Sequence, residues 1–139
     1  MKILIGAFGT DDGKTFTNRH FGDSNKFDIY EISSESVKFI KQINNNSVEE
    51  KVHADPKKAG SISKMLKSQG VQVVFSKQFG PNIKRIRKKF VCVKSSDENI
   101  KALQEIAIDN FEIISELLEE GEERGFIIQD ANHFKIAKL

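Results

Sequence analysis

Cysteine is almost absent from this chain of 139 residues, which has a single one, Cys92. One cysteine excludes a disulfide within the chain and the cysteine-rich frameworks that enclose metal ions and clusters. Its position between two valines is typical of a buried core thiol rather than a reactive one. Low cysteine content also suits a reducing compartment, so we expect a cytoplasmic protein.

Excess charge and long apolar runs are absent too. The formal net charge is only +2, which gives no reason to expect a nucleic-acid or membrane partner. The longest N-terminal apolar run, residues 3–8, is too short for a signal-peptide core or a membrane span. We therefore expect a soluble, unexported protein with one compact core.

Sequence signatures of catalysis and nucleotide binding are missing. No carboxylate lies between Lys2 and Thr10 in the first apolar run, whereas nucleases that use two metal ions need several carboxylates close together. The chain has no Gly-x-x-x-x-Gly-Lys-Ser/Thr stretch, and Gly6, Gly9 and Gly13 lack the dinucleotide-binding spacing. The sequence therefore predicts a protein that is not an enzyme.

What the chain does contain is an alternation of strand and helix patterns. Residues 95–121 combine capping-box spacing with apolar residues at helical intervals, which predicts one long helix. A short connection between two early strands requires an antiparallel hairpin. The remaining predicted elements are strands at residues 3–8, 27–32, 37–43, 71–76 and 90–93, a helix at residues 55–70, and a short helix that begins at residues 80–81.

This order predicts an α/β fold with a mixed five-stranded sheet and helices on both faces. We expect one domain over residues 1–121 and a C-terminal tail over residues 122–139, which either docks as a short strand or stays partly mobile. The first strand is apolar on both faces and should be interior. If four of the strands are parallel, the loops that hold His20, His53 and Gly80 converge at the edge where α/β sheets bind ligands.

The candidate site begins with the polar loop before the second strand. A loop imidazole at His20 is a candidate metal ligand or donor to an anion, and Arg19 is a candidate partner for an anionic ligand. Gly22 permits a tight turn beside them. His53, just before the first long helix, can reach the same edge. The alternative for His20 and His53 is that both are ordinary surface residues.

The turn Gly80-Pro81-Asn82 opens a helix and should leave the N–H groups of Asn82 and Ile83 free to bind an anion. The alternative is that these residues only make the turn. Five cations follow between residues 84 and 89, either as a solvated face or as a surface for an acidic partner. No aromatic residues alternate with them, so nucleic-acid binding is not expected. His133, near the C-terminus, has no partner at metal-ligand spacing.

The order of these motifs resembles the dinitrogenase iron-molybdenum cofactor biosynthesis family, also called the nitrogenase accessory factor family. The resemblance implies a three-layer, ribonuclease H-like fold and transient binding of an iron-sulfur or iron-molybdenum cluster. Where family members commonly have a glycine-rich loop with a histidine, this chain has residues 47–55, which contain His53 but no glycine. The matching motifs are Met1-Lys2-Ile3-Leu4-Ile5, His20-Phe21-Gly22, Phe27-Asp28-Ile29-Tyr30, Gly70-Val71-Gln72-Val73-Val74, Gly80-Pro81-Asn82 and Phe90-Val91-Cys92-Val93.

The resemblance favours a non-enzymatic carrier of a metallocluster, with donor and acceptor proteins as partners. The alternatives are a metal-free module that binds a small anion at the same sheet edge, and an interaction protein whose basic helix docks an acidic partner. In the carrier interpretation His20 and His53 are the metal ligands. The surrounding cofactor-binding residues are Arg19, Phe21, Gly22, Gly80 and Asn82.

Overall fold

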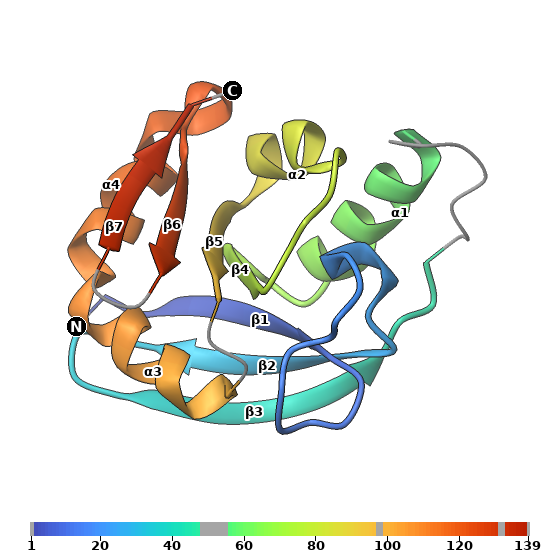
Figure 1. The fold of residues 1–139 in the computed structure, drawn as a ribbon, viewed down its shortest axis with the longest axis horizontal. Coiled ribbons are helices and arrows are strands. Elements are labelled where there is room, and N and C mark those ends of the chain that lie inside the picture. The colour runs from blue at the N-terminus through green and yellow to red at the C-terminus, as the bar shows by residue number, and fades with distance from the viewer. Residues whose placement is uncertain (1, 48–55, 97–98, 131–132, 139) are drawn as a thin grey trace.

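The computed structural model describes residues 2–47, 56–96, 99–130 and 133–138. Its helices are α1 (Pro56–Lys67), α2 (Ile83–Lys89), α3 (Ile100–Asp109) and α4 (Phe111–Glu120), with short 3-10 helices η1 (Phe21–Asp23) and η2 (Gly121–Glu123). Its strands are β1 (Leu4–Thr10), β2 (Lys26–Ile32), β3 (Val37–Asn44), β4 (Val73–Ser76), β5 (Val91–Ser95), β6 (Phe126–Asp130) and β7 (His133–Ala137). The strands form one sheet in the order β3-β2-β1-β4-β5-β6-β7 (Figure 1).

The sheet is mixed, as predicted. β1 pairs antiparallel with β2 and parallel with β4, and β2 pairs antiparallel with β3. β4, β5 and β6 continue in parallel, and β7 closes the edge antiparallel to β6. β1 is therefore interior, which confirms the expectation from its apolar pattern. The ribonuclease H-like assignment stays a prediction.

The predicted number of strands was wrong, because the sheet has seven rather than five. The two additional strands come from the segment predicted as a C-terminal tail. β6 pairs with β5 through residues 127–129, and the Ile127 side chain is fully buried. The local pattern of this segment was compatible with docking, but the partner strand is more than 30 positions earlier in the chain. Whether this segment joins the sheet therefore depends on its long-range pairing with β5, which its local sequence pattern does not show.

The single long helix predicted over residues 95–121 was also wrong, because it is two helices separated at Asn110. The backbone N–H of Asn110 and its side-chain Nδ2 both donate to the carbonyl of Ile106. Asparagine side chains compete in this way with helical hydrogen bonds. The apolar spacing continues across the break, since Ala107, Phe111 and Ile114 are all buried.

Two hydrophobic cores cover the opposite faces of the sheet. α1 and α2 pack on one face through Ile62, Leu66 and Ile86, and α3 and α4 pack on the other (Figure 1). Neighbouring residues of β1 alternate between them, with Ala7 in the first core and Phe8 in the second. Within the described ranges, no helix is both long enough and apolar enough to cross a membrane.

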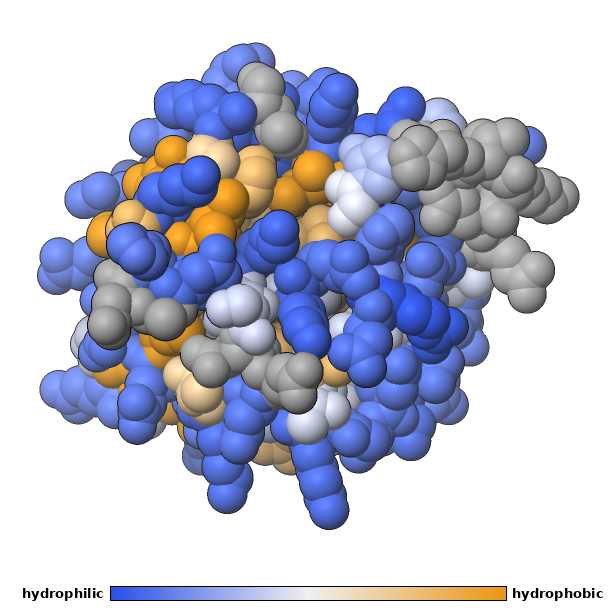
Figure 2. Space-filling view, viewed as in Figure 1, coloured by the Kyte–Doolittle hydropathy of each residue, from blue (hydrophilic) through white to orange (hydrophobic). Residues whose placement is uncertain are grey.

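The two edge strands expose large apolar side chains. Phe39 and Ile40 of β3 and Phe134 and Ile136 of β7 are each more than one-third exposed. Figure 2 shows apolar surface gathered on the side of the molecule where β6 and β7 lie. These side chains contribute little to the cores, so they serve as controls for substitutions of buried residues.

Replacing Ile127 with alanine tests whether β6 is part of the cooperative fold. Ile127 is fully buried and packs in the core under α3 and α4, so Ile127→Ala should lower the free energy of unfolding by about 2–5 kcal/mol. The matched control is Ile136→Ala, whose side chain is 42% exposed and should cost less than about 1 kcal/mol. Urea denaturation of both variants gives the comparison. Equal, small effects would show that β6 does not belong to the folded unit.

Candidate functional site

The candidate site lies at the edge where the parallel strands end. The chain leaves β1, runs through a polar loop and enters η1, while a second loop leaves β4 and leads to α2 (Figure 1). The backbone N–H of Phe21 donates to the carbonyl of Gln78 at 2.8 Å, and the Gln78 side chain donates to the carbonyl of Asn18. These two hydrogen bonds join the two loops at the position of His20.

Phe21 is the packing anchor of this junction. Its side chain is fully buried, with ring centroids 5.0 Å from Phe27 and 5.3 Å from Phe79. The sequence interpretation assigned Phe21 to the cofactor contacts. The structure places it in the hydrophobic core, where it fixes the backbone of the neighbouring His20.

His20 and Gly80 are brought into direct contact. Gly80 has a positive φ of 71°, and a Cβ atom added there would overlap the imidazole ring of His20. Glycine is therefore required at this position both for its backbone conformation and for the space that it leaves. The half-buried imidazole lies flush against the turn before α2 rather than extending freely into solvent.

The helix-start anion site predicted around Asn82 is incorrect in one respect. The N–H of Ile83, expected to be free, donates to the carbonyl of Gly80 at 3.1 Å. The side chain of Asn82 is only 7% exposed, and its Oδ1 accepts from Arg85. The Ile83 N–H is not available to an anion because it already forms this hydrogen bond within the turn at the start of α2. Asn82 still lines the pocket beside His20.

Lys58 is the site residue that the sequence analysis missed. Its side chain is almost buried, its Nζ lies 3.8 Å from Asp23 Oδ1, and it donates to Ser47 Oγ at 2.8 Å. The available signal was helical spacing: Lys58 is four residues before the apolar Ile62 in the helix predicted over residues 55–70, so the two side chains lie on the same face. A buried lysine requires polar partners, and here those partners come from η1 and from the segment after β3.

His20, Asp23, Lys58 and Asn82 form the polar part of one pocket between η1, α1 and α2. Gly22 also lines it, and Ala59, Ile62 and Phe79 supply apolar walls. The enclosed volume is about 10 Å³, which is room for about one water molecule. The pocket can therefore enclose a small ligand, whereas a larger one would contact His20 only at its mouth.

Arg19 does not line this pocket. Its Nη2 donates to Asp11 Oδ1 at 3.1 Å and to Asn25 Oδ1 at 2.8 Å. Asp11 also accepts from the Asn25 N–H and the Thr17 hydroxyl, so it holds the loop before His20 against the start of β2. Arg19 thus has a structural partner where the sequence suggested an anionic ligand.

Burial raises the pKa of the Asp11 carboxyl, but hydrogen bonds from Asn25 and Thr17 oppose this effect. Together with the hydrogen bond and charge of Arg19, they hold that pKa below its ordinary value. A carboxylate of this kind stabilises the fold above its ordinary pKa, and the contribution is lost as the pH falls through the lowered value. The His20 loop should therefore be sensitive to acid.

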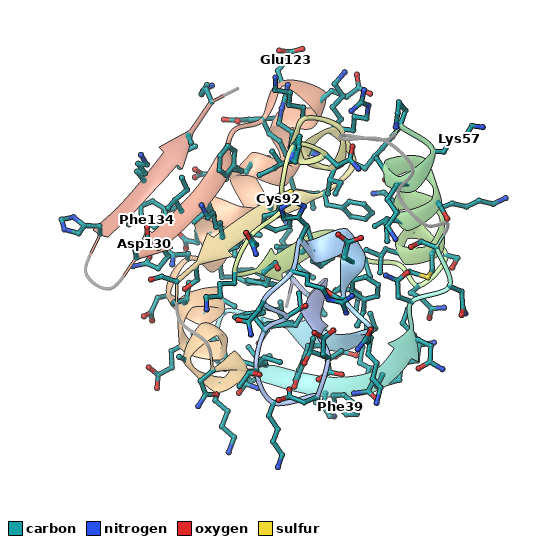
Figure 3. The ribbon with its side chains drawn as sticks, turned by 45° about the vertical axis from the view of Figure 1, so that its right-hand side comes forward. Phe39, Lys57, Cys92, Glu123, Asp130 and Phe134 are labelled. Carbon is teal, nitrogen blue, oxygen red and sulfur yellow. The ribbon has the colours of Figure 1, made fainter. Side chains whose placement is uncertain are left out.

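The other predicted positions are placed as follows. His53 lies outside the described residues, so its role as a metal ligand stays a prediction. His133 is exposed in β7. Cys92 is fully buried near the centre of the molecule (Figure 3), and burial raises the pKa of its thiol, which confirms the prediction of a core residue. The described part of the chain has no group of three or more His, Cys, Asp or Glu placed to hold a metal ion.

The fold and the pocket define a small mixed α/β protein with a histidine at the edge of the sheet where its parallel strands end. The model of the dinitrogenase iron-molybdenum cofactor family matches residues 1–107, so the chain belongs to this family. The resemblance inferred from the motifs is thereby confirmed. The match ends within α3, so α4, β6 and β7 lie beyond it.

The fold is similar to a crystal structure from Methanocaldococcus jannaschii described as that of a candidate dinitrogenase. The two chains are 21% identical, with a TM-score of 0.57, over 79% of this chain and 92% of the other. At this identity the likeness concerns the fold alone. No curated protein matches the chain.

Substituting Gly80 tests the contact that positions His20. Gly80→Ala should lower the free energy of unfolding by at least about 1 kcal/mol more than Gly70→Ala, because Gly70 shares the positive φ but has open space around it. Gly60→Ala, inside α1 with nothing within 4 Å, should instead stabilise by up to about 1 kcal/mol. Thermal or urea unfolding of the three variants provides the test. Equal losses at positions 80 and 70 would refute the contact.

Replacing Asp11 tests the acid sensitivity of the His20 loop. Asp11→Ala removes the acceptor of three side-chain and backbone donors, and should cost about 1–2 kcal/mol at neutral pH. The difference from the wild type should shrink as the pH falls below about 4 and then through the lowered pKa of Asp11, because the unfolded chain and, at still lower pH, the folded protein bind a proton at this carboxyl. Urea unfolding across this pH range measures it. Glu116→Ala, at an exposed helix position, should show no comparable difference at either pH.

Proposed function

We propose that this protein is a non-enzymatic carrier of an iron-sulfur or iron-molybdenum type cluster during cofactor assembly. The observation that supports the proposal most strongly is the His20 imidazole, fixed against Gly80 at the mouth of a pocket that also contains the Lys58 ammonium. Neutral imidazole is a common metal ligand, and a nearby cation favours a ligand of net negative charge. The family of the chain agrees with this cargo.

The residues present fit a loosely held cargo. His20 supplies one imidazole, Lys58 supplies charge, and Asn82 supplies a polar amide at the same pocket. The small enclosed volume leaves a cluster at the surface, where it is accessible to a receiving protein. A single firm ligand from the described residues is weak coordination, which suits transfer better than permanent retention.

The absence of an enzymatic role is part of the same proposal. β1 carries no Asp or Glu from Leu4 to Thr10, so the interior strand lacks the carboxylates on which two-metal nuclease chemistry depends. Purified protein with magnesium or manganese should then leave RNA–DNA hybrids uncut.

A second candidate is binding of a small anion without metal. The nearly buried Lys58 at the same pocket favours it. A compact oxyanion that contacts Lys58 from the pocket mouth would gain a charge-assisted hydrogen bond. This candidate predicts that phosphate raises the melting temperature of colourless protein, since a ligand that binds only the folded state stabilises it.

Substituting the histidines separates the two candidates. His20→Ala should lose most of the anaerobic cluster binding followed by visible absorbance and iron content, whereas the exposed-site control His133→Ala should bind like the wild type.

The His20 side chain is only half-buried and lines the pocket. His20→Ala should therefore change the free energy of unfolding by no more than about 1 kcal/mol, which thermal unfolding checks. Equal cluster binding by both variants would contradict the role of His20 as a ligand, and the absence of cluster binding by the wild type would contradict the carrier proposal. Colourless protein that phosphate stabilises in a Lys58-dependent manner would support the metal-free alternative.

A further inference from the structure

A strongly basic groove lies between α1 and α2, next to the His20 pocket. It has a volume of about 600 Å³, and five of its lining residues are cations: Lys64 and Lys67 from α1, and Arg85, Lys88 and Lys89 from α2. No acidic residue lines it among the residues that the structure describes. We call this surface the basic groove.

Helical spacing accounts for the concentration of charge. Arg85, Lys88 and Lys89 stand three and four positions apart, so they share one face of α2. Ile86, which is buried, turns another face of α2 into the core. Lys64 and Lys67 are likewise three positions apart on α1. Two helices therefore direct cationic faces at one groove.

Four of the five cations of the basic groove have no carboxylate partner within the described part of the chain. No carboxylate there lies within 4.0 Å of Lys64, Lys67, Lys88 or Lys89. Lys67 Nζ instead lies 4.7 Å from the centroid of the Phe90 ring, and burial, together with the charges of Arg124 and Lys89, lowers its pKa. Like charges held this close are unfavourable without an anionic partner.

The floor of the basic groove is formed by small, nonpolar residues. Ala59 and Gly60 line it between the aliphatic stems of the lysines. Such a floor accepts the apolar stripe of a helix while the rim pairs with acidic residues. No aromatic residue lines it among those that the structure describes, so these residues offer no platform on which nucleic-acid bases could stack. Its chemistry favours an amphipathic acidic helix over a nucleic acid.

The distribution of charge over the molecule supports this choice. Exposed carboxylates gather on the far end of α4 and on η2, at Glu119, Glu120, Glu122 and Glu123. In Figure 3, Glu123 points outward at one end of the molecule, and Lys57 extends outward from α1. These carboxylates adjoin α2, because Arg87 Nη1 donates to the carbonyl of Glu122 on η2. A long polyanion that runs along α2 beyond the basic groove would therefore meet them, whereas a short acidic helix can stay within the groove.

The basic groove is continuous with the candidate cluster site. Ala59 lines both the groove and the His20 pocket, and α1 and α2 form walls of both. We propose that the basic groove docks an amphipathic acidic helix of the protein that donates the cluster to His20 or receives it. This inference rests on the proposed carrier function, and it identifies the chemistry of the partner surface.

A synthetic helix tests docking on protein that carries no cluster. The probe is a fluorescent peptide of about 15–20 residues with leucines on one face and glutamates on the other, measured by fluorescence anisotropy. The Lys64→Glu/Lys88→Glu variant should bind it at least about tenfold more weakly than the wild type, since both positions are exposed in the groove. Lys64→Arg/Lys88→Arg should bind within about threefold of the wild type, because it keeps the charge.

Matched controls separate the groove from general electrostatics. Lys41→Glu/Lys101→Glu makes the same change in net charge at exposed positions in β3 and α3, and should change the peptide affinity by less than about threefold. Binding should also weaken as salt is raised, because exposed ion pairs are screened. Circular dichroism and thermal unfolding confirm that each variant is folded.

Three results would overturn the inference: no binding of the peptide, equal losses in the groove and control variants, or equally tight binding of a scrambled peptide of the same composition. Tighter binding of duplex DNA, lost in the groove variant, would assign the surface to nucleic acid instead. Salt-sensitive self-association lost in the same variant, with no peptide binding, would assign it to a second copy of the chain.

The His20→Ala variant keeps this test independent of the cluster. It should bind the peptide as the wild type does, because the imidazole does not line the basic groove. If His20→Ala loses cluster binding but keeps peptide binding, His20 is needed for the cluster and not for docking of the helix. Peptide binding by the wild type, with no cluster binding by any variant, would remove the carrier function and leave the docking surface in place.

Discussion

The burial of Phe21 is the constraint on which the candidate site depends. Its ring occupies the core beside Phe27 and Phe79, and its N–H is bonded to Gln78. These contacts tie the loop after β1 to the loop after β4. His20 is adjacent in sequence to this anchor, so its imidazole is held against Gly80. Hydrophobic packing thus positions a polar group at the sheet edge.

Charge in this molecule is organised locally although the total is nearly balanced. The formal net charge is +2, yet cations from α1 and α2 surround one groove and carboxylates gather at α4 and η2. Lys58 extends the cationic side into the His20 pocket, where Asp23 and Ser47 compensate its burial. The site proposed for an anionic cargo and the surface proposed for an acidic partner consequently share the same two helices.

The fold and the site were predictable to different extents. Local patterns identified the early strands, the hairpin and the interior position of β1, because those depend on side-chain alternation and short connections. They missed β6 and β7 as strands of the sheet, since that pairing joins distant parts of the chain. They also missed the break at Asn110, because the apolar spacing continues through it while the Asn110 side chain adds a hydrogen bond to the carbonyl of Ile106.

The sequence by itself determined the family, the mixed α/β character and the buried thiol of Cys92, because motif order and apolar spacing are local properties. It also placed His20 and Gly80 in loops expected at one edge. Only the tertiary structure decided which loop residues share a pocket: Lys58 enters it, whereas Arg19 is paired with Asp11. Contacts between side chains that are far apart in the chain depend on packing and burial. The residue spacing within a single segment shows neither packing nor burial.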